Sequence, residues 1–255
     1  MHVMTYATAA RAAAAAASRV LDLLRRHPAL VIGMPTGDTP VPMYRALVRA
    51  HRAGRADFSR ATTFNLDEFA GLGRGDAGSY RSYMEAHLFD HVNLRARSAC
   101  VPDGRSADWR REVARYEQRI ARAGGLDVIV LGLGRNGHIG FNEPADSLQV
   151  RTHRVALQPA TRRANARLFG GQWQAVPTHG VSMGVGTILG ARQVILLVTG
   201  AAKARMVARA LTGPITTRVP ASLLQAHPDV IVILDRAAAA HLAADLKVPR
   251  SQSRR

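Results

Sequence analysis

The stretch LDVIVLGLGRNGHIGFNEP, residues 126–144, joins a short apolar run to a loop rich in glycine. Its first six residues, 126–131, predict a buried strand, because such a run next to glycines is typical of a strand covered on both faces. Four other apolar runs predict further strands, at residues 29–34, 62–66, 193–198 and 230–234.

Helical patterns alternate with these strands. The Ala-rich segment 9–26 predicts a first amphipathic helix. Further helices are predicted at residues 41–53, at 79–89 with Ser79 as its cap, and at 109–123 with Gly124-Gly125 at its end. The alternation predicts one α/β domain with a doubly wound, mostly parallel, Rossmann-like sheet and helices on both faces. We place this domain at residues 1–247 and a basic, flexible tail at 248–255.

Composition excludes several classes of protein. The chain has 255 residues, 47% of them hydrophobic, which is enough for a large core and argues against a disordered chain. Cys100 is the single cysteine, so an intrachain disulfide cannot form. No uninterrupted apolar run of about 18 residues is present, so we expect no membrane span and a cytoplasmic protein.

The formal net charge is +17, from 35 basic and 18 acidic residues. Such a charge can indicate a nucleic-acid partner. The arginines are spread along the chain, however, and no RNA-binding aromatic motif accompanies them. A nucleic-acid role is therefore unlikely, and a small anionic substrate fits the charge equally well. The sequence leaves a homo-oligomer open.

In a parallel sheet, ligands bind beyond the carboxyl ends of the strands. The segment PTGDTP at 35–40 follows the first predicted strand. Its backbone N–H groups at a helix start suit phosphate, so Thr36, Gly37, Asp38 and Thr39 are candidate ligands. An ordinary strand-to-helix turn is the alternative. Asp38 is unexpected here, because a carboxylate repels phosphate; its side chain can point away or cap the helix.

Asp67 and Glu68 follow the second predicted strand. Adjacent carboxylates at a strand end can supply a general base that moves a proton at carbon. The alternative is one helix cap and one surface acid.

The loop after residue 131 has the GxGxxG spacing of a dinucleotide site. We reject that interpretation, because Gly140 and Pro144 oppose the helix that must follow, and residues 148–171 hold no acid for a ribose.

The same loop contains His138, which can transfer protons near neutral pH, and Glu143, which can orient the His138 ring or raise its pKa. A structural histidine is the alternative.

Two cationic features remain. Lys203, one of only two lysines, follows a strand at the start of a helix, where it can bind phosphate or be a solvated helix residue. The acid-free stretch 148–171 carries five arginines and few signs of regular structure. It can be a mobile, cationic lid or a solvated basic face.

From about residue 31 to residue 235, the chain contains a series of short motifs whose identity and order resemble those of the glucosamine-6-phosphate deaminase family. The blocks that carry the resemblance are PTGDTP at 35–40, TFNLDEF at 63–69, Ser79-Tyr80, GHIGFNEP at 137–144, TRRANAR at 161–167, GVGT at 184–187 and TGAAK at 199–203.

The resemblance implies conversion of glucosamine 6-phosphate and water to fructose 6-phosphate and ammonia, with no cofactor and no metal. It implies that Asp67 carries a proton between C2 and C1. It also implies that His138 opens the sugar ring, supported by Glu143 and Asn136, and that residues 36–39, Arg167 and Lys203 hold the phosphate.

Two positions depart from the family pattern. Many members have Asp where this chain has Asn136, and the best-known members have Gly where it has Asp38. Three alternative functions remain: a deaminase for galactosamine 6-phosphate, a 6-phosphogluconolactonase, and a sugar-phosphate sensor without catalysis. The 6-phosphogluconolactonases usually lack the FNEP continuation. The retained Asp67, His138 and Glu143 argue against the sensor.

Overall fold

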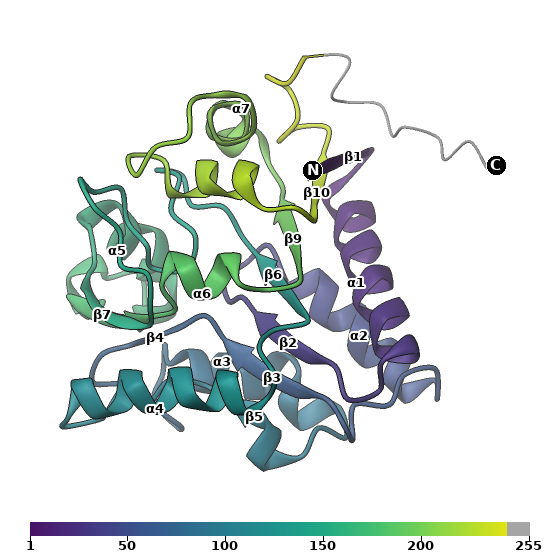
Figure 1. Ribbon diagram of the computed structural model, residues 1–255, viewed down its shortest axis with the longest axis vertical. Helices are drawn as coiled ribbons and strands as arrows, with labels where there is room; N and C mark the ends of the chain where they lie inside the picture. The colour runs from purple at the N-terminus through teal and green to yellow at the C-terminus, as the bar shows by residue number, and fades with distance from the viewer. Residues whose placement is uncertain (244–255) are drawn as a thin grey trace.

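The computed structural model describes residues 1–243; residues 244–247 and the predicted tail at 248–255 lie outside this range. Its strands form two sheets (Figure 1). The strands are β1 (His2–Tyr6), β2 (Val31–Met34), β3 (Thr62–Asn65), β4 (Asp67–Phe69), β5 (Ala99–Cys100), β6 (Val128–Leu131), β7 (His153–Ala156), β8 (His179–Ser182), β9 (Gln193–Val198) and β10 (Val230–Asp235).

The helices follow the predicted alternation with the strands. The α-helices are α1 (Ala9–Arg26), α2 (Val41–Arg52), α3 (Tyr80–His87), α4 (Trp109–Arg122), α5 (Pro159–Asn165), α6 (Val185–Leu189) and α7 (Ala204–Thr212). Short 3-10 helices are η1 (Phe89–His91), η2 (Ala96–Ser98), η3 (Ala166–Phe169), η4 (Trp173–Ala175), η5 (Ala201–Lys203) and η6 (Pro220–Ala226).

The larger sheet has seven strands in the order β1-β10-β9-β6-β2-β3-β5, and all of them are parallel. Successive residues of its strands point to opposite faces. In β6, Val128 and Val130 pack with α1, α2 and α3, whereas Ile129 and Leu131 pack with α4, α6 and α7. Helices therefore cover both faces (Figure 1), as predicted for a doubly wound single domain.

The sheet reverses its strand order between β2 and β6. From β2 the chain adds β3 and β5 on one side, and then it returns to the other side of β2 to add β6 and β9. The loops after β2 and β6 consequently leave the sheet in opposite directions and open a crevice at its carboxyl edge. The strands lie close there, because a Cβ on Gly33 of β2 would overlap the Ile129 side chain of β6.

A second sheet of three strands, in the order β4-β8-β7, is antiparallel and was not predicted. β4 begins at Asp67, so the two acids lie in a strand and not in a loop. β7, α5 and η3 lie within residues 148–171, so the expectation of little regular structure there was wrong.

Within residues 1–243, no helix has the length and apolar character to cross a membrane.

Candidate active site

The functional residues predicted from the sequence lie at the carboxyl edge of the larger sheet. Loop 35–40 follows β2, loop 132–144 follows β6, and the segment 199–203 follows β9. Leu66 joins the end of β3 to Asp67, and its N–H donates to the carbonyl of Met34 at 3.3 Å. The parallel arrangement of β2, β3, β6 and β9 therefore brings these segments to one edge.

The two adjacent carboxylates have different surroundings. Glu68 is fully buried and accepts hydrogen bonds from the hydroxyl of Ser79 at 2.8 Å and from the N–H groups of Tyr80 and Arg81 at 2.9 Å. These donors lie at the start of α3, where Ser79 is the N-cap as predicted. Glu68 is thus an anchor for the N-terminus of α3, and neither acid lies on the surface, because Asp67 is only 5% exposed.

Asp67, by contrast, is a buried carboxylate. Among residues 1–243, no side chain or N–H group donates a hydrogen bond to its carboxylate. Burial, and next the charge of Glu68, raise the pKa of Asp67 well above its ordinary value. Its Oδ2 lies 3.5 Å from the place that a Cβ on Gly140 would occupy, so it borders the loop that contains His138. A raised pKa strengthens a carboxylate as a proton acceptor.

The His138 ring lies against two side chains from different elements. Its Nδ1 lies 3.5 Å from Oε2 of Glu143 and 3.3 Å from the hydroxyl of Thr161 on α5. Gly134 is required on the ring's other side, because any Cβ there would overlap the imidazole. With Nδ1 directed at these partners, Nε2 is the ring nitrogen left for a ligand. This arrangement suits a histidine that exchanges protons with a bound molecule.

Glu143 is 7% exposed and is held by hydrogen bonds. The Asn136 amide donates to its Oε2 at 2.8 Å, and the N–H of Gln158 donates to its Oε1 at 3.2 Å. Burial raises the pKa of Glu143, but His138, Thr161 and Asn136 outweigh burial and hold the pKa below its ordinary value. Glu143 therefore stays an anion beside the imidazole.

Asn136 contacts the histidine only through the backbone: its Oδ1 accepts from the His138 N–H at 3.3 Å. Its amide also donates to Oε1 of Gln158 at 3.3 Å. Asn136 thus orients Glu143 and the loop, while the imidazole faces Glu143. No helix follows this glycine-rich loop, which agrees with the rejection of a dinucleotide site.

Tyrosines from two helices hold the loop at 35–40. The hydroxyl of Tyr83 on α3 donates to the carbonyl of Gly37 at 2.6 Å, and the hydroxyl of Tyr44 on α2 donates to the carbonyl of Pro35. Gly37 has a φ of 98°, which other residues rarely adopt. On the other side, the Lys203 ammonium donates to the hydroxyl of Thr39 at 3.4 Å. The segments after β2 and β9 are therefore in direct contact.

Lys203 is oriented by the turn that precedes it. The N–H of Gly200 donates to the buried carboxylate of Asp235 at 3.0 Å, which ties the ends of β9 and β10 together. Burial, and next the charge of Arg135, lower the pKa of Lys203, whereas Asp38 opposes them. Lys203 is thus a partly desolvated cation beside loop 35–40, where its ammonium can donate to an anion.

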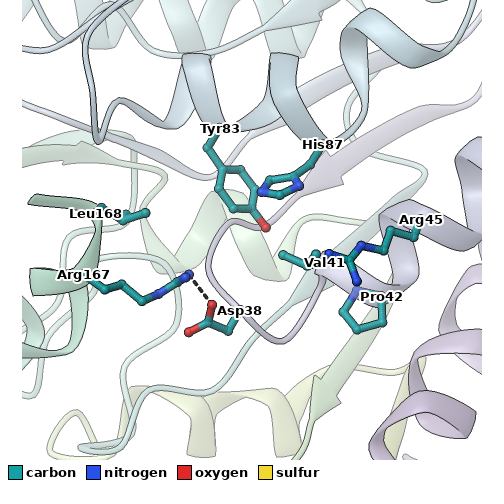
Figure 2. A pocket seen from close by; sticks show the side chains of 8 residues that line it. All are labelled: Asp38, Val41, Pro42, Arg45, Tyr83, His87, Arg167 and Leu168. Atoms are coloured by element: carbon teal, nitrogen blue, oxygen red, sulfur yellow. Dashed lines mark ion pairs between the residues drawn. The ribbon is translucent and has the colours of Figure 1, made fainter. Parts of the chain in front are cut away.

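Asp38 forms an ion pair with Arg167 of η3 (Figure 2). No side chain caps α2, so Asp38 is not a helix cap. The pair borders a cavity of about 360 Å³ whose lining also includes Arg45, Tyr83 and His87. Arg167 therefore reaches loop 35–40, as predicted, but through Asp38.

The α5–η3 segment bridges the two halves of the site. Thr161 contacts His138, the Asn165 amide oxygen accepts from the Tyr80 hydroxyl at 3.1 Å, and Arg167 contacts Asp38. Sequence reasoning gave no role to Thr161, Gln158 or Tyr80. Their partners are remote in sequence, and the only signal was the presence of Thr161 and Tyr80 in the recognised blocks.

The comparisons with known proteins identify the family of this chain. The profile of the family described as glucosamine-6-phosphate isomerases/6-phosphogluconolactonase matches residues 5–232. A glucosamine-6-phosphate deaminase of Alkaliphilus oremlandii is 45% identical over 232 residues, which are 91% of this chain and 94% of that protein. A deaminase of Halothermothrix orenii is 46% identical over 215 residues, which are 84% of this chain and 89% of that protein.

Two solved structures are similar in fold. One, described as a monomeric glucosamine-6-phosphate deaminase, has a TM-score of 0.91 and 41% identity, covering 94% of this chain and 99% of that one. A 6-phosphogluconolactonase of Trypanosoma brucei has a TM-score of 0.74 and 20% identity, covering 95% of this chain and 98% of that one, and this similarity shows the fold alone. By the family profile and by its relatives, this chain belongs to the glucosamine-6-phosphate isomerase/6-phosphogluconolactonase family.

Proposed function

We propose that this protein is a glucosamine-6-phosphate deaminase, which converts glucosamine 6-phosphate and water to fructose 6-phosphate and ammonia. The observation that carries the proposal is the meeting of the buried Asp67 carboxylate, a histidine–carboxylate pair and the contact of Lys203 with loop 35–40 at one sheet edge. Relatives of that activity, 45% identical over 91% of the chain, support it.

The phosphate of the substrate binds at residues 36–39, where Lys203 and Arg167 supply positive charge. Lys203 already contacts Thr39, and Arg167 reaches the loop through Asp38. Binding at the phosphate end places C1 and C2 of the sugar toward the loop that contains His138. Such remote binding holds the reacting atoms in position and contributes to the rate.

His138 opens the sugar ring. Ring opening removes the proton from the anomeric hydroxyl and delivers a proton to the ring oxygen, which an imidazole can do in two steps. Glu143 lies 3.5 Å from Nδ1 and stabilises the imidazolium between those steps. The product is an open-chain aldehyde, whose carbonyl makes the hydrogen on C2 acidic.

Asp67 removes that C2 proton and returns it to C1. The intermediate is an enolamine, and protonation at C1 gives the imine of fructose 6-phosphate. Water adds to the imine carbon, and ammonia leaves as the ketone forms. Because only protons move before this hydrolysis, the chemistry requires no hydride carrier.

The residues of this proposal contact one another within a single subunit, and a similar solved structure is described as monomeric, so we propose that one subunit is sufficient for activity. We also propose that the enzyme acts in the cytoplasm, since a phosphorylated sugar does not cross a membrane unaided. Sedimentation analysis at the enzyme concentration of the assay tests the first point.

The decisive experiment measures ammonia and fructose 6-phosphate together, with purified protein and glucosamine 6-phosphate. We expect equal amounts of both products. Galactosamine 6-phosphate and 6-phosphogluconolactone are the comparison substrates, and faster turnover of either would overturn the assignment. Asp67→Asn is the matched control, which we expect to lose about 10²–10⁴-fold in kcat, with activity of the unaltered enzyme falling as pH drops through the raised pKa of Asp67.

A further inference from the structure

Asp38 places a carboxylate inside the loop that is to bind phosphate. Its side chain is 70% exposed and pairs with the guanidinium of Arg167, which is 52% exposed (Figure 2). A carboxylate and a phosphate present similar anionic oxygens to a guanidinium. Asp38 therefore pairs with the Arg167 guanidinium that a bound phosphate would contact.

The charge of Asp38 also reaches the second cation of this site. Asp38 raises the pKa of Lys203 against the larger effects of burial and Arg135, so its negative charge lies within range of the ammonium. Arg45 and His87 line the same cavity as Asp38 and Arg167. Asp38 is thus the one acidic residue among the side chains that line this cavity within the described chain, and it lowers the positive potential there.

We propose that Asp38 sets the phosphate affinity of the site by holding Arg167 in the free protein, so that a ligand's phosphate must displace a carboxylate from this guanidinium. The inference rests on the proposed phosphate role of residues 36–39. An exposed ion pair such as Asp38–Arg167 contributes little to stability. A dianionic phosphate that also contacts Lys203 can therefore displace the Asp38 carboxylate from Arg167. Asp38 thus sets the affinity of the site for phosphate and takes no part in the chemical steps.

One consequence concerns ligand release. Inorganic phosphate and a sugar phosphate must both displace Asp38 from Arg167, at the same cost in free energy. Asp38 therefore weakens the binding of both by a similar factor and hastens release of the phosphorylated product.

The test compares Asp38→Asn with the unaltered protein at fixed ionic strength. Titration calorimetry with inorganic phosphate gives the dissociation constant, and steady-state assays with glucosamine 6-phosphate give KM and kcat separately. We expect the dissociation constant and KM to fall about three- to tenfold, as removal of one nearby negative charge predicts. Asp38→Ser, a small uncharged replacement, should give the same direction if Asp38→Asn folds poorly.

Asp22→Asn is the matched control. Asp22 lies on α1 and pairs with Arg25 at 3.2 Å, and its substitution removes the same charge elsewhere. We expect no change in KM or in phosphate affinity for this variant. An equal gain in Asp22→Asn and Asp38→Asn would overturn the proposal, because net charge alone would then explain it.

A double substitution tests the route through Arg167. In an Arg167→Ala background, Asp38→Asn should give clearly less gain in phosphate affinity than in the unaltered protein. An undiminished gain, or phosphate affinity that is unchanged or weaker in Asp38→Asn, would overturn the inference. Phosphate binding can be measured without turnover, so the two proposals can fail separately. If the unaltered protein releases no ammonia but Asp38→Asn binds phosphate more tightly, the proposed function is contradicted and the role of Asp38 stands.

Discussion

Asp67 and Glu68 are neighbours in the chain and are both buried, yet their carboxylates meet different surroundings. Glu68 accepts hydrogen bonds from Ser79, Tyr80 and Arg81, which lower its pKa, although burial outweighs them and leaves the pKa raised. Asp67 has no such donors among residues 1–243, and burial raises its pKa. A buried carboxylate without donors is unstable as an anion and reactive as a base, as a proton carrier needs to be.

This difference predicts how Asp67→Asn changes stability with pH. The pKa of Asp67 is higher in the folded than in the unfolded chain, so its contribution to stability is full below the unfolded-state pKa and is lost as pH rises through the folded-state pKa. Asp67→Asn removes this loss. We expect its Tm to exceed that of the unaltered protein at neutral pH, by about 2–4 °C for each kcal/mol of penalty removed.

Thermal denaturation from about pH 3, below the ordinary pKa of an Asp carboxyl, to about pH 8 provides the measurement. The difference in Tm should vanish at the acidic end and grow toward neutral pH. Asp22→Asn, at a site on α1 with 38% side-chain exposure, is the control for loss of a carboxylate without burial. A difference that is constant with pH would contradict the assignment of Asp67 as a high-pKa group.

Helix α3 is the element that joins β4 to loop 35–40. Ser79 caps it and donates to Glu68 of β4, while Tyr80 contacts Asn165 and Tyr83 holds the carbonyl of Gly37. A change at the start of α3 is therefore expected to affect both stability and phosphate binding.

Substitution Ser79→Ala removes the cap and one donor to Glu68. We expect unfolding to become easier by about 1–2 kcal/mol, which is the range for loss of an N-cap. We also expect a higher KM, because Tyr83 then holds the loop less firmly. Thr8→Ala is the matched control: Thr8 caps α1 through the N–H of Arg11, away from the site, and should lower stability while KM stays unchanged. An unchanged KM in Ser79→Ala would contradict the coupling through α3.

On the scale of the whole molecule, the net charge of +17 opposes compaction. Added salt screens this repulsion, so we expect Tm to rise as NaCl increases from about 0.01 M to 0.3 M, over which the Debye length falls from about 30 Å to below 8 Å. Sodium phosphate at equal ionic strength should raise Tm further, since it also binds the site. A Tm that is insensitive to salt would contradict self-repulsion, and equal effects of the two salts would contradict a phosphate site.

The elements that could be predicted from the sequence are those that local patterns define. The strand at 193–198 and the helix at 9–26 were predicted with their observed bounds, and α2 and α4 to within one residue, because hydrophobic periodicity and capping residues act over a few positions. The position of loops 35–40 and 132–144 at strand ends followed from the same patterns. Strands β1 and β5 and the sheet β4-β8-β7 were missed, because these short strands carry little periodicity and depend on distant partners.

The site divides in the same way. The sequence by itself determined which residues are available: His138 in a loop that cannot become a helix, two acids after a strand, and a glycine turn before α2. Only the tertiary structure decided that Glu68 anchors α3 while Asp67 stays without a donor, that Thr161 contacts His138, and that Asp38 holds Arg167. The physical reason is distance along the chain: these contacts join residues that are neighbours only after the sheet has brought its strand ends together.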